Sequence, residues 1–74
     1  MIITDTNFSN NKATEKGGAI YATSDVQIIA DGKDVILENN TMGTGEDEIA
    51  NDIYLDNDSK VYLNARTGQK IQIN

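Results

Sequence analysis

Apolar and polar side chains alternate along this chain in short runs, and clusters of Asp, Asn, Ser and Gly separate the runs. Alternation with a period of two, in runs rich in Ile, Val and Thr, predicts β-strands joined by turns. The predicted strands cover residues 2–8, 19–23, 26–30, 35–38, 52–55, 60–65 and 70–74. Residues 12–16 and 41–51 are polar and are predicted to be a connector and a loop.

The same pattern predicts which face of each strand is buried. We expect one face of the first strand to carry Ile2, Thr4, Thr6 and Phe8. In the later strands we expect Ile20, Ala22, Val26, Ile28 and Ala30 to point inward, and Tyr21 to point outward.

The strands repeat. Ile20 corresponds to Ile53 at an offset of 33 residues, Val26 to Val61 at 35, and Val35 to Ile71 at 36. Phe8-Ser9-Asn10-Asn11 corresponds to Leu37-Glu38-Asn39-Asn40 at 29. A unit of three strands and three corners is typical of one coil of a three-sided parallel β-helix. The sequence therefore predicts an all-β, right-handed parallel β-helix of about two to three coils, with residues 1–74 as a single β-solenoid segment. An antiparallel meander is the alternative.

In such a coil, like residues stack in columns about 4.8 Å apart. The expected columns are Ile20 with Ile53, Val26 with Val61, Ile28 with Leu63, Leu37 with Ile73, Phe8 with Leu37, and Tyr21 with Tyr54. Asn10-Asn11 and Asn39-Asn40 tolerate the positive φ of a sharp corner and are predicted to form amide ladders between coils. Gly17-Gly18 lets the backbone turn and approach the neighbouring coil.

Phe8 and Asn11, followed by Gly17-Gly18-Ala19-Ile20, resemble the repeat of bacterial autotransporter passengers, best known from the Chlamydia-type polymorphic outer-membrane proteins. In the second repeat Leu37 replaces Phe, Asn40 keeps its place, and Ala50-Asn51-Asp52-Ile53 replaces Gly-Gly-Ala-Ile. The resemblance implies a β-helix displayed at the cell surface, often with a role in adhesion. The expected structural motif residues are Phe8, Asn11, Gly17, Gly18, Ala19, Ile20, Leu37, Asn40 and Ile53.

Composition narrows the function further. The chain contains no His and no Cys, so it lacks the usual general base, a thiolate metal site and a disulfide. Its net charge of −6 disfavours nucleic acid as a partner. The apolar runs are short, such as Val35-Ile36-Leu37, so we expect no membrane insertion by this segment. We expect no cofactor.

Three groups of residues are candidate sites. The pairs Asp31/Asp34 and Asp56/Asp58 could act on a glycan, but both lie in predicted turns, where Asp commonly bonds the backbone. The loops Glu46-Asp47-Glu48 and Asp56-Asn57-Asp58 could bind Ca²⁺, although neither fits a known calcium motif. Tyr21, Tyr54 and Tyr62 could form an exposed face that stacks on sugars. The sequence therefore predicts that the chain is not an enzyme and that it has no catalytic residue and no metal site.

The predicted function is a non-catalytic extracellular scaffold or adhesin segment. Both predicted end strands lack a capping element, which repeat proteins need for solubility. The expected partners are therefore further coils, from a longer array or from identical chains, with a host-surface protein or glycan left open. Two alternatives stand: a filament subunit that stacks head to tail, and a carbohydrate-binding or carbohydrate-active fragment.

Overall fold

The computed structural model describes residues 1–73 and shows an all-β chain, which confirms the predicted class. Within this range the only helical element is the 3₁₀ turn η1 (Gly45–Asp47). The strands are β1 (Ile2–Thr4), β2 (Phe8–Ser9), β3 (Lys12–Ala13), β4 (Ile20–Ala22), β5 (Val26–Ala30), β6 (Val35–Glu38), β7 (Thr41–Met42), β8 (Ile49–Ala50), β9 (Ile53–Leu55), β10 (Val61–Ala65) and β11 (Ile71–Gln72). No helix in the described part of the chain is long and apolar enough to cross a membrane.

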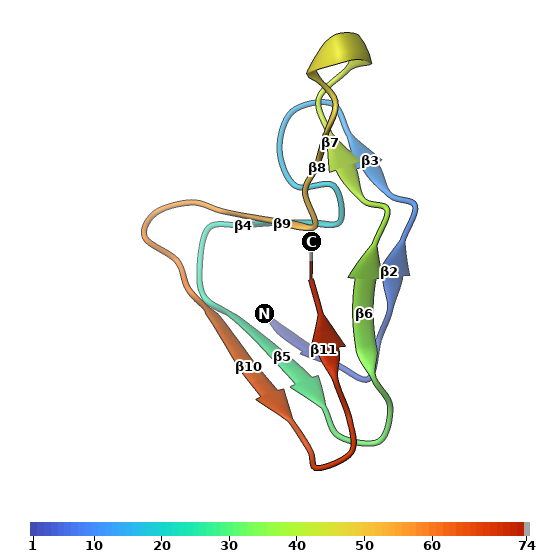
Figure 1. Ribbon diagram of the computed structural model, residues 1–74. Helices are drawn as coiled ribbons and strands as arrows, with labels where there is room; N and C mark the ends of the chain where they lie inside the picture. Colours follow the sequence, from blue (N-terminus) through green and yellow to red (C-terminus); the bar gives the residue numbers. More distant parts are fainter. Residues whose placement is uncertain (74) are drawn as a thin grey trace.

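The chain runs through the same small sheets in successive passages. We call β1–β3 the first passage, β4–β7 the second and β8–β11 the third. The sheet orders are β1-β5-β10, β11-β6-β2, β3-β7-β8 and β4-β9, so strands of different passages lie side by side. Figure 1 shows β10, β5 and β1 along one side of the resulting outline and β6 with β2 along another. Among residues 1–73, six strand pairs are parallel and one is antiparallel, which excludes the meander.

The predicted register is confirmed at most columns. Ile20 pairs with Ile53 and Tyr21 with Tyr54, while Val26 pairs with Val61 and Ile28 with Leu63. Phe8 pairs with Leu37, and Val35 with Ile71. The expected Leu37–Ile73 pair does not form part of the ladder, because β11 ends at Gln72; Asn74, the last residue of the predicted end strand, lies outside the described residues.

The first predicted strand is wrong in two ways. It is divided into β1 and β2, because Asp5 has a φ of 51° and the chain bends there. Its buried residue is Ile3, whereas Ile2 is 69% exposed. Ile3 pairs with Ile28, which faces the core, and a parallel partner in that register fixes the face that points inward.

Residues 12–13 and 41–50 also differ from the prediction. Lys12–Ala13 is a strand, β3, which pairs with β7. The predicted polar loop contains the antiparallel pair β7–β8, with Thr41 opposite Ala50 and Met42 opposite Ile49. This hairpin projects beyond the other sheets and carries η1 at its tip (Figure 1). The first and second passages therefore share a further strand position, occupied by β3 and β7, that the sequence did not predict.

The core lies between the sheets and belongs mainly to the second passage. Its buried apolar residues are Ile3, Ile20, Ala22, Val26, Ile28, Ala30, Val35 and Leu37. The outward position predicted for Tyr21 is confirmed, since it is 47% exposed. The inward side chains of the second passage pack together, and residues of the other two passages, such as Ile3, Ile53 and Val61, pack against them.

Candidate functional site

The side chain of Asn40 is buried, with 1% of its surface exposed, and each of its two polar atoms forms hydrogen bonds. Its Nδ2 donates to Oδ1 of Asp52 at 2.7 Å and to the carbonyl oxygen of Phe8 at 3.2 Å. Its Oδ1 accepts hydrogen bonds from the backbone N–H and the Nδ2 of Asn11, both at 3.0 Å. The predicted amide ladder between Asn11 and Asn40 is therefore confirmed.

The two asparagines of each pair have different structural roles. Asn10 and Asn39 hold the positive φ values of 59° and 58°, whereas Asn11 and Asn40 supply the ladder. The ladder ends on the carboxylate of Asp52, a fully buried residue that the sequence analysis did not single out. The available signal was its place in the repeat, since it aligns with Ala19, one residue before the buried Ile20. A charged side chain at a core-adjacent position indicates a specific buried contact.

The two glycines of Gly17-Gly18 meet the chain in different ways. Gly17 has a φ of +71°, and a Cβ there would lie 2.2 Å from the carbonyl oxygen of Ile20. A Cβ on Gly18 would lie 2.4 Å from the carbonyl oxygen of Asn51 and 2.6 Å from the nitrogen of Thr41. The Gly18 N–H donates to that same Asn51 oxygen at 3.0 Å. Gly17 makes the turn, and Gly18 lets two neighbouring passages touch.

The remaining residues of the predicted motif lie around this contact. Phe8 and Leu37 stack on each other, as do Ile20 and Ile53, and Ala19 packs against the core. The structure thus brings the Phe-x-x-Asn and Gly-Gly-Ala-Ile residues together at the boundary between passages, around buried backbone and Asn40.

Carboxylates at the corners accept backbone hydrogen bonds from the next passage. Asp5 accepts the N–H groups of residues 31–33, Asp25 that of Lys60 at 2.9 Å, and Asp34 that of Lys70 at 3.0 Å. The hydrogen bond from the Asp31 N–H is the main cause that lowers the pKa of Asp5, because it favours the charged form. These carboxylates join passages in the way the asparagine ladder does.

The candidate catalytic pairs occupy such corners. Asp31 forms an ion pair with Arg66 at 3.2 Å, and Asp34 bonds the Lys70 backbone. Asp56 accepts the hydroxyl of Tyr21 at 2.9 Å and the N–H of Asn57 at 3.0 Å. The hydroxyl of Tyr21 is the first cause that lowers the pKa of Asp56. The oxygens of Asp34 and Asp56 thus form contacts within the chain.

The acidic residues of the candidate calcium loop at 46–48 lie in and beside the 3₁₀ turn η1. Glu46 and Asp47 lie in η1, and Glu48 accepts the hydroxyl of Thr41 at 3.0 Å and lies 3.6 Å from Lys12. Within residues 1–73, no three His, Cys, Asp or Glu side chains are grouped so that they could hold a metal ion.

The structure separates the three tyrosines. The rings of Tyr21 and Tyr54 form an edge-to-face pair with centroids 5.8 Å apart. The ammonium of Lys16 lies 5.6 Å from the Tyr21 centroid and 5.2 Å from that of Tyr54. Tyr62 belongs to another sheet, in β10, so the three rings do not form one face.

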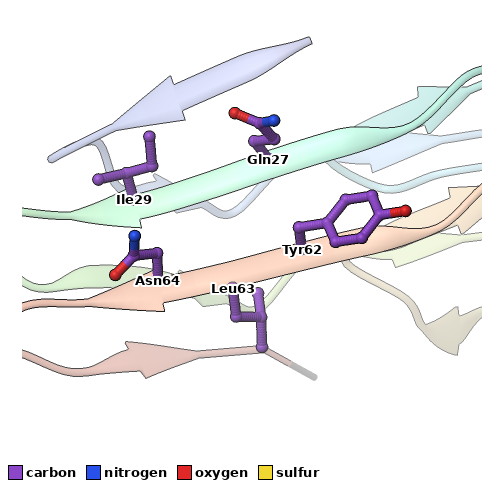
Figure 2. A pocket seen from close by; sticks show the side chains of 5 residues that line it. All are labelled: Gln27, Ile29, Tyr62, Leu63 and Asn64. Carbon is purple, nitrogen blue, oxygen red and sulfur yellow. The ribbon is translucent and has the colours of Figure 1, made fainter.

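Tyr62 instead borders an open hollow of about 330 Å³ on the sheet of β5 and β10. The lining residues are Gln27, Ile29, Tyr62, Leu63 and Asn64. Figure 2 shows the side chains of Gln27, Ile29, Tyr62 and Asn64 on one side of the two strands, with that of Leu63 on the other. Register pairs Tyr62 with Gln27 and Asn64 with Ile29, so the four outward side chains form two adjacent rows.

The fold and its contacts show the class of protein: an all-β chain in which parallel strands of successive passages stack on one another. The passages are joined at their corners by asparagine, glycine and carboxylate residues. Residues 5–23 match the Chlamydia polymorphic membrane protein repeat, and this stretch contains Phe8, Asn11 and Gly17-Gly18-Ala19-Ile20. No curated protein and no solved structure matches the chain.

Proposed function

We propose that residues 1–74 are a segment of a right-handed parallel β-helix, displayed at the bacterial cell surface, which acts as a non-catalytic scaffold or adhesin. The observation that carries this proposal is the coincidence of the repeat match with the contact between passages. The matched stretch contains Asn11 and Gly18, and these residues bond or touch Asn40, Thr41 and Asn51 of the following passages. In this proposal, the residues of the repeat form the contacts through which one passage packs on the next.

The scaffold role follows from where the polar groups are used. Buried amides and corner carboxylates bond the chain's own backbone and one another. A side chain that holds two passages together serves the length and stiffness of a stack. Length and stiffness are what a surface stalk requires.

The display part of this proposal has a direct test. Antibodies raised against the chain should label intact cells of the source bacterium, and protease added to intact cells should remove the label. A cytoplasmic protein serves as the control for intactness. Labelling that requires permeabilised cells would contradict surface display.

A second candidate is a filament subunit, and a specific observation favours it. Leu63 faces inward in the register of Ile28 but is 58% exposed, and Val61 and Ile71 beside it are only partly covered. A further passage, supplied by an identical chain, would cover these apolar side chains. Light scattering over a range of concentrations distinguishes the candidates, because a mass that stays at one chain excludes the filament.

A further inference from the structure

We propose that the hollow over β5 and β10 binds a neutral sugar unit, with the Tyr62 ring as the stacking surface and Gln27 and Asn64 as hydrogen-bonding groups. This inference goes beyond the scaffold role, because a scaffold needs no ligand. It can fail while the scaffold proposal stands.

The first argument is the chemistry of the lining. None of the five lining residues carries a charge, although the chain as a whole has a net charge of −6. Each of the two amides offers both donors and an acceptor, and a tyrosine ring offers a flat apolar face with a polar edge. Sugar rings present hydroxyls at their rim and C–H groups on their faces, so amides beside an aromatic ring match them.

The second argument is that these groups are free to bind. Within the described part of the chain, the side chains of Gln27, Tyr62 and Asn64 form no hydrogen bond, and Tyr62 is 50% exposed. The contrast with the other tyrosines is clear. Tyr21 donates its hydroxyl to Asp56, and Lys16 covers the rings of both Tyr21 and Tyr54. Of the three tyrosines, Tyr62 is the one whose ring and hydroxyl the chain itself does not use.

The third argument is spacing. Neighbouring strands lie about 4.8 Å apart, and side chains two residues apart on one strand lie about 7 Å apart. Gln27, Ile29, Tyr62 and Asn64 stand at the corners of that rectangle, and Figure 2 shows all four on the same side of the sheet. The rectangle has the scale of a single sugar ring, and the open hollow leaves room for a chain of sugars to continue.

The test is an NMR titration of the ¹⁵N-labelled chain with chitotetraose and maltotetraose as neutral probes and a heparin-derived tetrasaccharide as the anionic probe. We expect a neutral probe to shift the amide signals of residues 27–29 and 62–64, and the anionic probe to shift none of them. Tyr62→Ala should weaken binding about tenfold, whereas Tyr62→Phe, which keeps the ring, should stay within about threefold.

Tyr21→Ala is the matched control, because it removes an exposed tyrosine of the other sheet and should leave the affinity unchanged. Since Gln27 and Asn64 are exposed, Gln27→Ala and Asn64→Ala should retain the melting temperature while weakening binding. Either no shift with both neutral probes at about 10 mM, or equal losses in Tyr62→Ala and Tyr21→Ala, would overturn the proposal. Shifts caused by the heparin fragment alone would overturn it as well.

Discussion

The second and third passages carry similar residues in matched register, yet the inward apolar side chains are fully buried in the second passage and not in the third. Ile28 of β5 is 0% exposed, whereas its partner Leu63 in β10 is 58% exposed. Val26 is likewise 0% exposed, and its partner Val61 is only partly buried. The difference lies in position, since β5 is between β1 and β10, and β10 has a neighbour on one side among the described strands. Burial in this architecture therefore depends on being covered from above and below, which a strand's own sequence does not specify.

The second and third passages also differ in the hydrogen-bonding side chains at their corners. Asp25 and Asp34 of the second passage accept the N–H groups of Lys60 and Lys70. By the register of the adjoining strands, Lys60 and Lys70 are also the residues that occupy the positions of Asp25 and Asp34 in the third passage. An ammonium group only donates hydrogen bonds, so it cannot accept a backbone N–H from a further passage. Head-to-tail stacking would lack these two bonds, which counts against the filament candidate.

The largest expected effect separates the two passages directly. Ile28→Ala should destabilise the chain by about 2–5 kcal/mol, because it opens a cavity that is enclosed on both sides. Leu63→Ala removes an equally large side chain at the paired position and should cost less than about 1 kcal/mol. Urea unfolding followed by circular dichroism measures both values. Equal losses would mean that Leu63 is covered in solution, and a self-associated chain would then be the explanation to pursue.

A smaller loss is expected where backbones touch. Gly18→Ala would place a Cβ 2.4 Å from the Asn51 carbonyl oxygen, and we expect a cost of about 1–3 kcal/mol because backbone cannot move aside easily. Gly32→Ala is the matched control, since the nearest atom to its Cβ would be Oδ2 of Asp5 at 3.3 Å, a contact that requires a displacement of only a few tenths of an ångström. The control should stay within about 1 kcal/mol of the wild type. A harmless Gly18→Ala would contradict the close approach of the passages.

The repeat register could be predicted because like residues recur with matched turns. The columns Ile20–Ile53, Val26–Val61 and Phe8–Leu37 all follow from that recurrence. The face of the first strand could not, because Ile2 and Ile3 are identical residues and only the pairing of Ile3 with Ile28 decides between them. The corner asparagines were recognisable from their tolerance of positive φ, but which of each pair enters the interior depends on the bend itself.

The remaining errors concern contacts that have no local signature. The β7–β8 pair consists of two-residue strands around a polar segment, so no alternating run marks it. The burial of Asp52 depends on Asn40, which lies 12 residues earlier and faces it across the hairpin. The separation of Tyr62 from Tyr21 and Tyr54 depends on which sheet each strand joins. The spacing of like residues in the sequence predicted which residues stack in a column. It could not predict contacts between residues of different columns, such as Asn40 and Asp52.

The smallest predicted effect is a pH dependence at the corner between the first and second passages. The pKa of Asp5 is lowered from 3.8, first by the N–H of Asp31 and then by those of Gly32 and Lys33, with burial acting in the opposite direction. A depressed folded-state pKa means that the bonds stabilise the fold above the unfolded value and that this contribution disappears as the pH falls through the folded-state pKa. Asp5→Asn should therefore lower the urea midpoint at pH 7, and the gap to the wild type should narrow below about pH 4.

Asp58→Asn is the control from the third passage, because Asp58 accepts no hydrogen bond from residues 1–73 and, like asparagine, tolerates its φ of 58°. A gap for Asp5→Asn that is the same at pH 7 and at about pH 3 would show that its carboxylate does not hold the two passages together through its charge.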